Sequence, residues 1–296
     1  MKKYKKILAS IFVLLAGSLW GTMGIFVRTY TKEALSAIDI VGIRTIITSL
    51  ILFLWLLVYK RGLLCIKVKD LWCFLGTGLG SIVFFNYCYF KCITLTSMSV
   101  AAVMLYTAPA IVIVLSYFIF KEQLTKVKLL ALVMTLVGCV FVTGLIGSSE
   151  PLSGYGILVG LGAGFGYALY SVFSRCAIQR GYHSLTIMFY TFFFASLCVL
   201  PLIDIGHIER VCFSKVSMMS FSIVFSLVST VLPYGLYTYA LNSIENGKAS
   251  IIATIEPVVA SLIGIIFYKE VITSSEYLGM FLIIGAITLC NLKFNK

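Results

Sequence analysis

The chain has 296 residues, of which 60% are hydrophobic and only 11% are charged. Soluble domains carry about 25% charged residues, so this composition excludes a chain that meets water over its whole surface. Its net charge of +12 would favour nucleic-acid binding in a soluble protein, but here the basic residues separate long apolar runs. The sequence therefore predicts a polytopic membrane protein surrounded by lipid, without a nucleic-acid partner.

Apolar segments long enough to cross a bilayer follow one another with short connections. A transmembrane helix needs roughly 20 apolar residues. The predicted spans are residues 8–27, 37–58, 71–90, 98–119, 129–146, 154–173, 184–203, 217–240, 250–267 and 276–292. We expect an all-α membrane protein with ten transmembrane helices and no room for a soluble domain.

Basic residues are unevenly distributed over the predicted connections. With a cytoplasmic N-terminus, 16 of the 23 Lys and Arg residues fall in cytoplasmic segments, 6 in external ones, and Arg44 lies within a span. Cytoplasmic loops of membrane proteins are enriched in Lys and Arg. The bias predicts a multi-pass protein of the plasma membrane with both termini in the cytoplasm.

Cysteine and histidine give no metal-binding pattern. The chain has nine cysteines and two histidines, but no CxxC motif. Cys88 and Cys92 are spaced to share a helix face, yet two thiols without a third ligand make a poor zinc site. We expect neither a metal nor another cofactor, and interpret the cysteines as small apolar residues of the helices.

One motif occurs twice, 148 residues apart. Pro109 is followed twelve residues later by Lys121-Glu122, and Pro257 is followed twelve residues later by Lys269-Glu270. The residues between each proline and its charged pair are almost all apolar. A proline within an apolar helix, repeated at half the chain length, indicates a duplicated membrane protein.

The repetition extends to aromatic and basic positions. Trp20 lies eight residues before Arg28, as Tyr167 lies eight residues before Arg175. Each half contains five predicted spans, and because five is odd, the second half enters the membrane from the opposite side. We therefore expect two inverted five-helix repeats, residues 8–146 and 154–292, a common plan of secondary transporters.

These features together resemble the EamA family of the drug/metabolite transporter superfamily. The resemblance is carried by Phe-Lys-Glu-Gln-Leu-Thr at 120–125, by Glu256-Pro257 and by Tyr-Lys-Glu at 268–270. It implies a carrier, often an exporter of amino acids or other small metabolites. The halves differ in one respect, because Ala108 precedes the first proline where Glu256 precedes the second.

No enzymatic motif such as GxSxG, HExxH or a P-loop is present, and we do not expect an enzyme. Polar groups within the membrane are costly unless they are used or paired. Arg44, about seven residues into the second span, is the clearest candidate. It either binds a substrate carboxylate, locks a gate by pairing with Asp39 or another segment, or snorkels to the interface.

Three carboxylates complete the charged candidates. Glu256 beside Pro257 is suited to receive a substrate ammonium group or a coupling proton, and the alternative is a structural role within the proline break. Glu122 and Glu270 end equivalent spans on opposite sides of the membrane. We interpret them as interfacial carboxylates that pair with Lys121, Lys269 or a helix N-terminus, or as gate latches.

Further polar groups fall inside the predicted spans, where a buried hydroxyl or amide needs a partner. As a set they are suited to line a substrate cavity, although ordinary packing is an alternative for each. They are Trp20, Asn86, Tyr106, Tyr170, Tyr190, Tyr234 and Tyr237. Helix breaks at Pro109, Pro233 and Pro257 are expected beside the site.

The sequence predicts a secondary transporter of a small polar metabolite, such as an amino acid, that works by alternating access. Export is favoured on the family resemblance alone. The alternatives are an uptake carrier, an exporter of drugs or quaternary ammonium compounds, and a non-transporting membrane sensor or scaffold. The sequence does not specify the substrate, the ion coupling or the oligomeric state, for which a homodimer is one alternative.

Overall fold

The computed structural model describes residues 2–145, 153–271 and 273–291. The predicted span limits at residues 146 and 292 lie outside these ranges. The described residues are mostly helical and include no strand, and nine of their helical segments are long and apolar enough to cross a membrane. The predicted span that is not among these nine is the fifth, whose helix, Lys126–Val142, has 17 residues, one fewer than the shortest of the nine. The all-α membrane fold is thus confirmed.

The segments that correspond to the ten predicted spans are built from one to three helical elements each. In chain order they are α1 (Lys2–Gly21) with α2 (Met23–Lys32); α3 (Ala37–Tyr59); α4 (Leu71–Leu75) with η3 (Gly76–Val83) and α5 (Phe84–Leu95); α6 (Met98–Leu105) with α7 (Ala108–Phe120); α8 (Lys126–Val142); α9 (Gly154–Gln179); α10 (Ser184–Val199); α12 (Val216–Ser226) with η5 (Leu227–Val231) and α13 (Leu232–Ala240); α14 (Asn246–Ala253) with α15 (Ile255–Tyr268); and α16 (Ser274–Asn291). The short elements η1 (Arg61–Leu64), η2 (Val68–Asp70) and α11 (Ile205–Cys212) lie in the connections, and η4 (Leu200–Leu202) ends the span of α10.

Several spans are interrupted. Two of the interruptions precede prolines: α7 carries Pro109 and α15 carries Pro257 in the first turn. Proline is tolerated there because the first N–H groups of a helix have no intrahelical partner. Pro233 is in the first turn of α13, directly after the π-helix η5. All three prolines therefore lie at helix starts.

Equivalent local structures recur 148 residues apart. Helices α6 and α14 each have eight residues and begin at Met98 and Asn246. The π-helices η3 and η5 end at Val83 and Val231. Helices α7 and α15 end on left-handed lysines, Lys121 at φ 56° and Lys269 at φ 54°. The correspondence thus extends from the repeated motif to the backbone.

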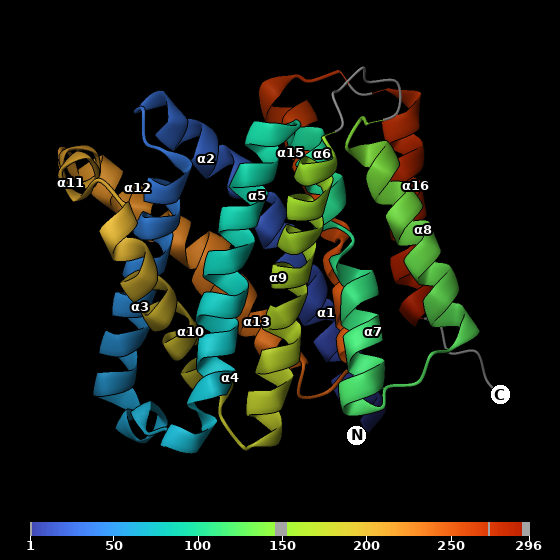
Figure 1. The fold of residues 1–296 in the computed structure, drawn as a ribbon, viewed down its shortest axis with the longest axis horizontal. Coiled ribbons are helices and arrows are strands. Elements are labelled where there is room, and N and C mark those ends of the chain that lie inside the picture. The colour runs from blue at the N-terminus through green and yellow to red at the C-terminus, as the bar shows by residue number, and fades with distance from the viewer. Residues whose placement is uncertain (1, 146–152, 272, 292–296) are drawn as a thin grey trace.

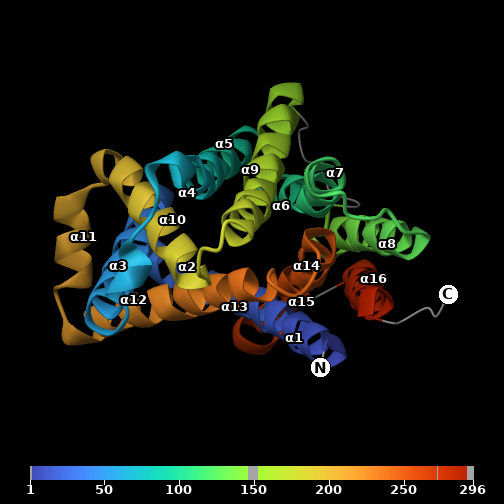
Figure 2. The same ribbon diagram turned by 90° about the horizontal axis from the view of Figure 1, so that it is seen from below.

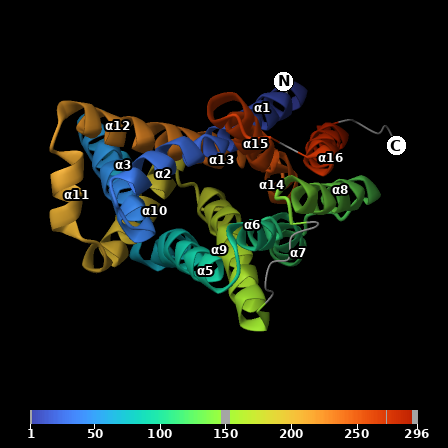
Figure 3. The same cartoon turned by 90° about the horizontal axis from the view of Figure 1, so that it is seen from above.

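The helices form a bundle in which the start of α1 and the end of α16 lie at one end (Figure 1). We call this the terminal end and the other the distal end. Helix α7 finishes at the terminal end, whereas α15 finishes at the distal end (Figure 1). Viewed from either end, α8 and α16 pair at one edge of the molecule and α3, α11 and α12 lie at the opposite edge (Figure 2 and Figure 3).

Helix α1 approaches the break between α14 and α15 through two glycines. A Cβ atom on Gly17 would lie 2.6 Å from the carbonyl oxygen of Ala253, and one on Gly21 would lie 2.7 Å from that of Glu256. No larger residue fits at such distances. Small residues on one face permit this close helix packing. The first half of the chain is thereby held against the backbone that carries Glu256.

Candidate functional site

A cluster of aromatic side chains from both halves occupies the centre of the bundle. Trp20 of α1, Tyr170 of α9, and Tyr234 and Tyr237 of α13 are buried in one core. The Tyr234 ring lies edge-on to Trp20 at 5.1 Å and to Tyr170 at 4.8 Å between centroids. Such edge-to-face contacts suit aromatic quadrupoles. The structure thus brings four of the predicted site residues together.

The polar groups of this cluster are only partly satisfied. The Tyr170 hydroxyl lies 2.6 Å from Thr238 Oγ1, and the Tyr237 hydroxyl lies 2.7 Å from Ser171 Oγ. Trp20 Nε1 is buried without a hydrogen-bond partner. The cluster borders a cavity of about 10 Å³, which is just enough for one water molecule. A free indole N–H is therefore available to a ligand acceptor.

Glu256 lies at the start of α15, within electrostatic range of three tyrosines. Tyr167 presents its hydroxyl to the Glu256 carboxylate, and the charge of Glu256 also acts on the hydroxyls of Tyr106 and Tyr89. Glu256, Tyr106 and Tyr167 are each partly exposed, unlike the core cluster. Glu256 thus has polar partners and keeps accessible surface.

Arg44 approaches the same region from α3. Its side chain is only 5% exposed, so it does not snorkel to the interface. One Nη atom lies 3.7 Å from the sulfur of Met23, and Nε has no partner. The charges of Arg44 and Glu256 act on each other, but within the described part of the chain Arg44 belongs to no ion pair.

The suggested pairing of Arg44 with Asp39 is wrong. Asp39 accepts hydrogen bonds from the backbone N–H and hydroxyl of Ser36 at 3.1 and 2.5 Å, and from the backbone N–H of Asp204 at 2.9 Å. It therefore caps α3 and ties it to the connection after α10. Because its oxygens are engaged in this way, Asp39 serves the fold and leaves Arg44 available.

Two predicted site residues have their polar groups engaged elsewhere. The Tyr190 hydroxyl donates to the carbonyl of Leu64 at 2.6 Å, beside an apolar groove of about 480 Å³ between α3 and α10. Asn86 donates its amide to the carbonyl of Ile82, one turn earlier in the same span, at 2.7 Å. Both groups are satisfied by backbone, because lone carbonyls near the loop and the π-helix offer acceptors. Neither contacts the Arg44–Glu256 region through these bonds.

The repeated carboxylates end in different surroundings. Glu122 is buried and accepts hydrogen bonds from the backbone N–H groups of Asn246 and Gly247. Of the partners predicted for Glu122, the structure therefore shows a helix N-terminus, that of α14. Glu270 is half-exposed and pairs with Arg28 at 2.5 Å, not with Lys269. A carboxylate at a helix N-terminus is favoured by the helix dipole as well as by the hydrogen bonds.

Sequence reasoning missed Tyr167, whose hydroxyl faces Glu256. The available signal was the equivalence of Tyr167 to Trp20 in the two repeats, because Trp20 is a predicted site residue. For a metal, the described residues hold no group of three potential His, Cys, Asp or Glu ligands. The site therefore combines one cation, one carboxylate and aromatic walls.

A sequence model of the EamA-like transporter family matches residues 7–144 and again 154–292. The chain belongs to this family. An uncharacterized transporter of Archaeoglobus fulgidus is 28% identical over 93% of both chains. The uncharacterized transporter YwfM of Bacillus subtilis is 25% identical over 92% of this chain and 89% of its own. Family and relatives indicate a membrane transporter and give no support to a sensor or scaffold.

A solved crystal structure has the same fold. It superposes with a TM-score of 0.75 over 95% of both chains, at 16% sequence identity. At that identity the likeness concerns the fold alone. The twofold match of the family model agrees with the backbone correspondence found 148 residues apart.

Proposed function

We propose that this EamA-like protein is a secondary transporter that exports a small zwitterionic metabolite, such as an amino acid, by alternating access. The observation that carries the proposal is the relation between Arg44 and Glu256. They are opposite charges from the two halves of the chain, both inside the bundle, and they form no ion pair with each other. A zwitterion would supply the missing partner of each.

The energetic argument concerns the cost of an unpaired charge in a membrane. An arginine at the centre of a transmembrane helix costs about 2.5–3.5 kcal/mol on insertion scales. A substrate carboxylate at Arg44 would offset that cost in the bound state only, and its ammonium group would lie toward Glu256. Trp20 and the tyrosines would hold the apolar part and donate hydrogen bonds, as ligand sites commonly do.

Alternating access is supported by the small size of the central cavity. A volume of about 10 Å³ holds one water molecule and no metabolite. The aromatic cluster must therefore separate before a substrate enters. The spans are interrupted at equivalent places in the two halves, before Pro109 and before Pro257. Such interruptions are the sites where transporter helices commonly coordinate substrate and move.

A second candidate substrate class is a quaternary ammonium compound. The observation in its favour is the group of aromatic rings near Glu256, because cations bind to the faces of Trp and Tyr. Such a substrate needs the carboxylate but not Arg44. Direction rests on the family resemblance alone, and uptake is the alternative.

The test is transport by the purified protein in proteoliposomes, preceded by a thermal-shift screen for substrates, since a ligand of the folded state raises its stability. Arg44→Ala should abolish transport of zwitterionic substrates and spare purely cationic ones. Arg210→Ala, which changes an exposed arginine of α11, is the matched control. Equal loss of both substrate kinds in Arg44→Ala would contradict carboxylate binding by Arg44.

A further inference from the structure

Glu122 and Glu270 occupy equivalent helix ends but point to different partners. The backbone is the same in both: Lys121 and Lys269 are left-handed, and the N–H groups of Glu122 and Glu270 donate to the carbonyls of Ser116 and Gly264 at 3.2 and 3.1 Å. This is the usual closure of a helix C-terminus by a left-handed residue. The difference is therefore confined to the two carboxylate side chains.

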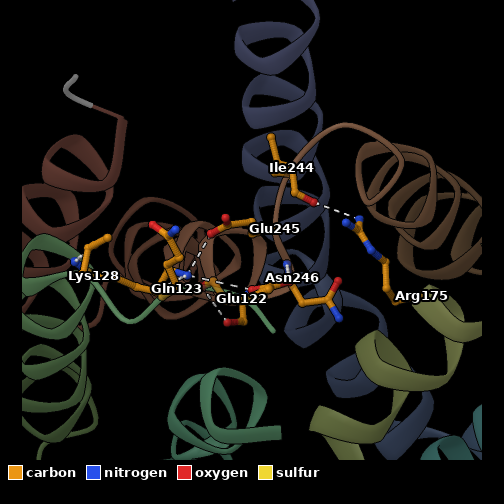
Figure 4. A network of polar contacts seen from close by, with 10 residues as sticks. Glu122, Gln123, Lys128, Arg175, Ile244, Glu245 and Asn246 are labelled. Carbon is orange, nitrogen blue, oxygen red and sulfur yellow. Dashed lines mark hydrogen bonds and ion pairs between the residues drawn. The ribbon is translucent and has the colours of Figure 1, made fainter. Parts of the chain in front are cut away.

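At the terminal end, Glu122 joins the two halves. Its oxygens lie 2.8 and 3.2 Å from the backbone nitrogens of Asn246 and Gly247, the first two residues of α14. Lys128 approaches the carboxylate to 3.8 Å and pairs with Glu245 at 2.8 Å, as Figure 4 shows. The carboxylate thus satisfies N–H groups that a helix leaves free at its start.

Arg175 closes the same end from α9. Its guanidinium donates to the carbonyls of Leu241 and Ile244, in the connection that leads into α14 (Figure 4). The start of α14 is thereby held by a carboxylate on its N–H groups and by a cation on the carbonyls before it. Such charge-assisted bonds are about twice as strong as neutral ones.

At the distal end, Glu270 does not bind the start of α6. The counterpart of α14 is α6, and the N–H groups of Met98 and Ser99 at its start have no acceptor in the described part of the chain. Glu270 instead pairs with Arg28, and both side chains are about half-exposed. Arg28 also lies over the Tyr268 ring, 4.0 Å from its centroid. The two ends therefore differ: Glu122 holds the start of α14, whereas Glu270 pairs with Arg28 and leaves the start of α6 without a carboxylate.

Gly264 makes room for the alternative position of Glu270. A Cβ atom on Gly264 would lie 2.2 Å from Glu270 Oε2, so the carboxylate lies directly against the bare backbone of α15. The equivalent residue of α7 is Ser116, which is buried. The second repeat thus keeps its carboxylate between its own helix and Arg28, away from the start of α6, whereas the first repeat extends its carboxylate to the start of α14.

We propose that Glu270 is the latch of the distal end. In the alternate state it leaves Arg28 and accepts hydrogen bonds from the N–H groups of Met98 and Ser99, while Glu122 releases α14. The two carboxylates would thus close opposite ends of the transporter in turn. The proposal rests on the alternating access proposed above, but its readout does not require transport.

The experiment measures hydrogen exchange of backbone amides by mass spectrometry at short labelling times, on the full-length protein in lipid nanodiscs. Glu122→Gln should speed exchange at the start of α14 and slow it at Met98 and Ser99. A hydrogen bond to a charged group is worth about 1.5–3 kcal/mol, so changes of about tenfold or more are expected. In the double variant with Glu270→Gln, both helix starts should exchange fast.

Glu276→Gln is the matched control, because Glu276 caps its own helix through the N–H of Thr273 at 2.9 Å. It should change neither α6 nor α14. Faster exchange at α14 with unchanged exchange at α6 in Glu122→Gln would overturn the proposal and leave Glu122 a structural residue. This outcome concerns the latch alone, since transport by the wild-type protein is measured separately.

A second variant covers the case in which Glu122→Gln does not fold. Gly264→Ala displaces the Glu270 carboxylate from its position on α15 and leaves Glu122 untouched. It should slow exchange at Met98 and Ser99, and adding Glu270→Gln should restore fast exchange there. Unchanged exchange at α6 in Gly264→Ala would overturn the proposal independently.

Discussion

Replacing Arg44 by methionine is expected to stabilise the protein when no substrate is bound. Arg44 lies seven residues after the start of α3, which is roughly 10 Å along the helix at about 1.5 Å per residue. It is buried, its Nε has no partner, and no ion pair neutralises it within the described residues. Methionine fills a similar volume without the charge.

The size of the effect follows from the cost of the buried charge. Arginine costs about 2.5–3.5 kcal/mol at the centre of a membrane helix. Against this stand the contact with Met23 and the interaction with the charge of Glu256. We therefore expect a gain of about 1–3 kcal/mol, in line with hydrophobic replacement of buried charges in other proteins. When a substitution stabilises a protein but removes its function, the original residue is usually one that is retained for binding.

The assay is thermal unfolding in lipid nanodiscs with and without a substrate from the screen. Roughly 2–4 °C per kcal/mol applies to domains of 150–250 residues, so Arg44→Met should raise the unfolding temperature by several degrees. The same variant should lose the further rise that a zwitterionic substrate gives. Arg210→Met, on an exposed residue, should change neither value. A fall in the stability of Arg44→Met without substrate would contradict a net cost of the buried charge and make Arg44 a structural residue.

Two predictions concern the scaffold around the site. Gly279→Ala should destabilise the protein by about 1–3 kcal/mol through overpacking, because the added Cβ would lie 2.6 Å from the carbonyl oxygen of Gly138. Gly24→Ala, which has open space around it, should be tolerated. Thermal unfolding measures both variants, and equal effects would contradict the packing argument. Burial and the charge of Lys60 lower the pKa of His183 below its ordinary 6.5. The unfolded chain then binds the proton more tightly, so the free energy of unfolding should fall as the pH drops below about 6.5. His183→Asn, which keeps a helix cap, should flatten that slope, and an unchanged slope would exclude His183 as its source.

The spans were predictable because a bilayer demands long apolar segments, and composition records that demand directly. Their interruptions were predictable only where proline marks them, as before Pro109 and Pro257. Pro233 likewise follows the π-helix that ends at Val231, but the break at Thr22 and the π-helix that ends at Val83 carry no such mark. Close packing between helices, such as the approach of Gly21 to Glu256 beside Thr22, is not reported by any local pattern.

The charged residues of the site stood out in the sequence, whereas the hydroxyls did not. Arg44 and Glu256 interrupt apolar runs, where a charge is costly, and the structure places both inside the bundle. A tyrosine in an apolar helix carries no comparable signal, because most tyrosines there only pack. The sequence therefore predicts Tyr190 as a site residue, although its hydroxyl donates to the carbonyl of Leu64. It does not mark Tyr167, although the hydroxyl of Tyr167 faces Glu256.

The two halves of the chain are equivalent at the helix ends that carry Glu122 and Glu270, and they differ at the centre. The helix ends with Glu122 and Glu270 are duplicated down to the backbone. At the same 148-residue offset, Glu256 corresponds to Ala108, and Arg44 corresponds to Phe192, which packs edge-on against Tyr234 at 5.0 Å. In the alternating access proposed above, each end closes in turn, which requires equivalent groups at the two ends. A substrate that keeps the same orientation in both states requires unique charges at the centre. The same distinction predicts that exchanging Glu256 and Ala108 between the halves should abolish transport without preventing either end from closing.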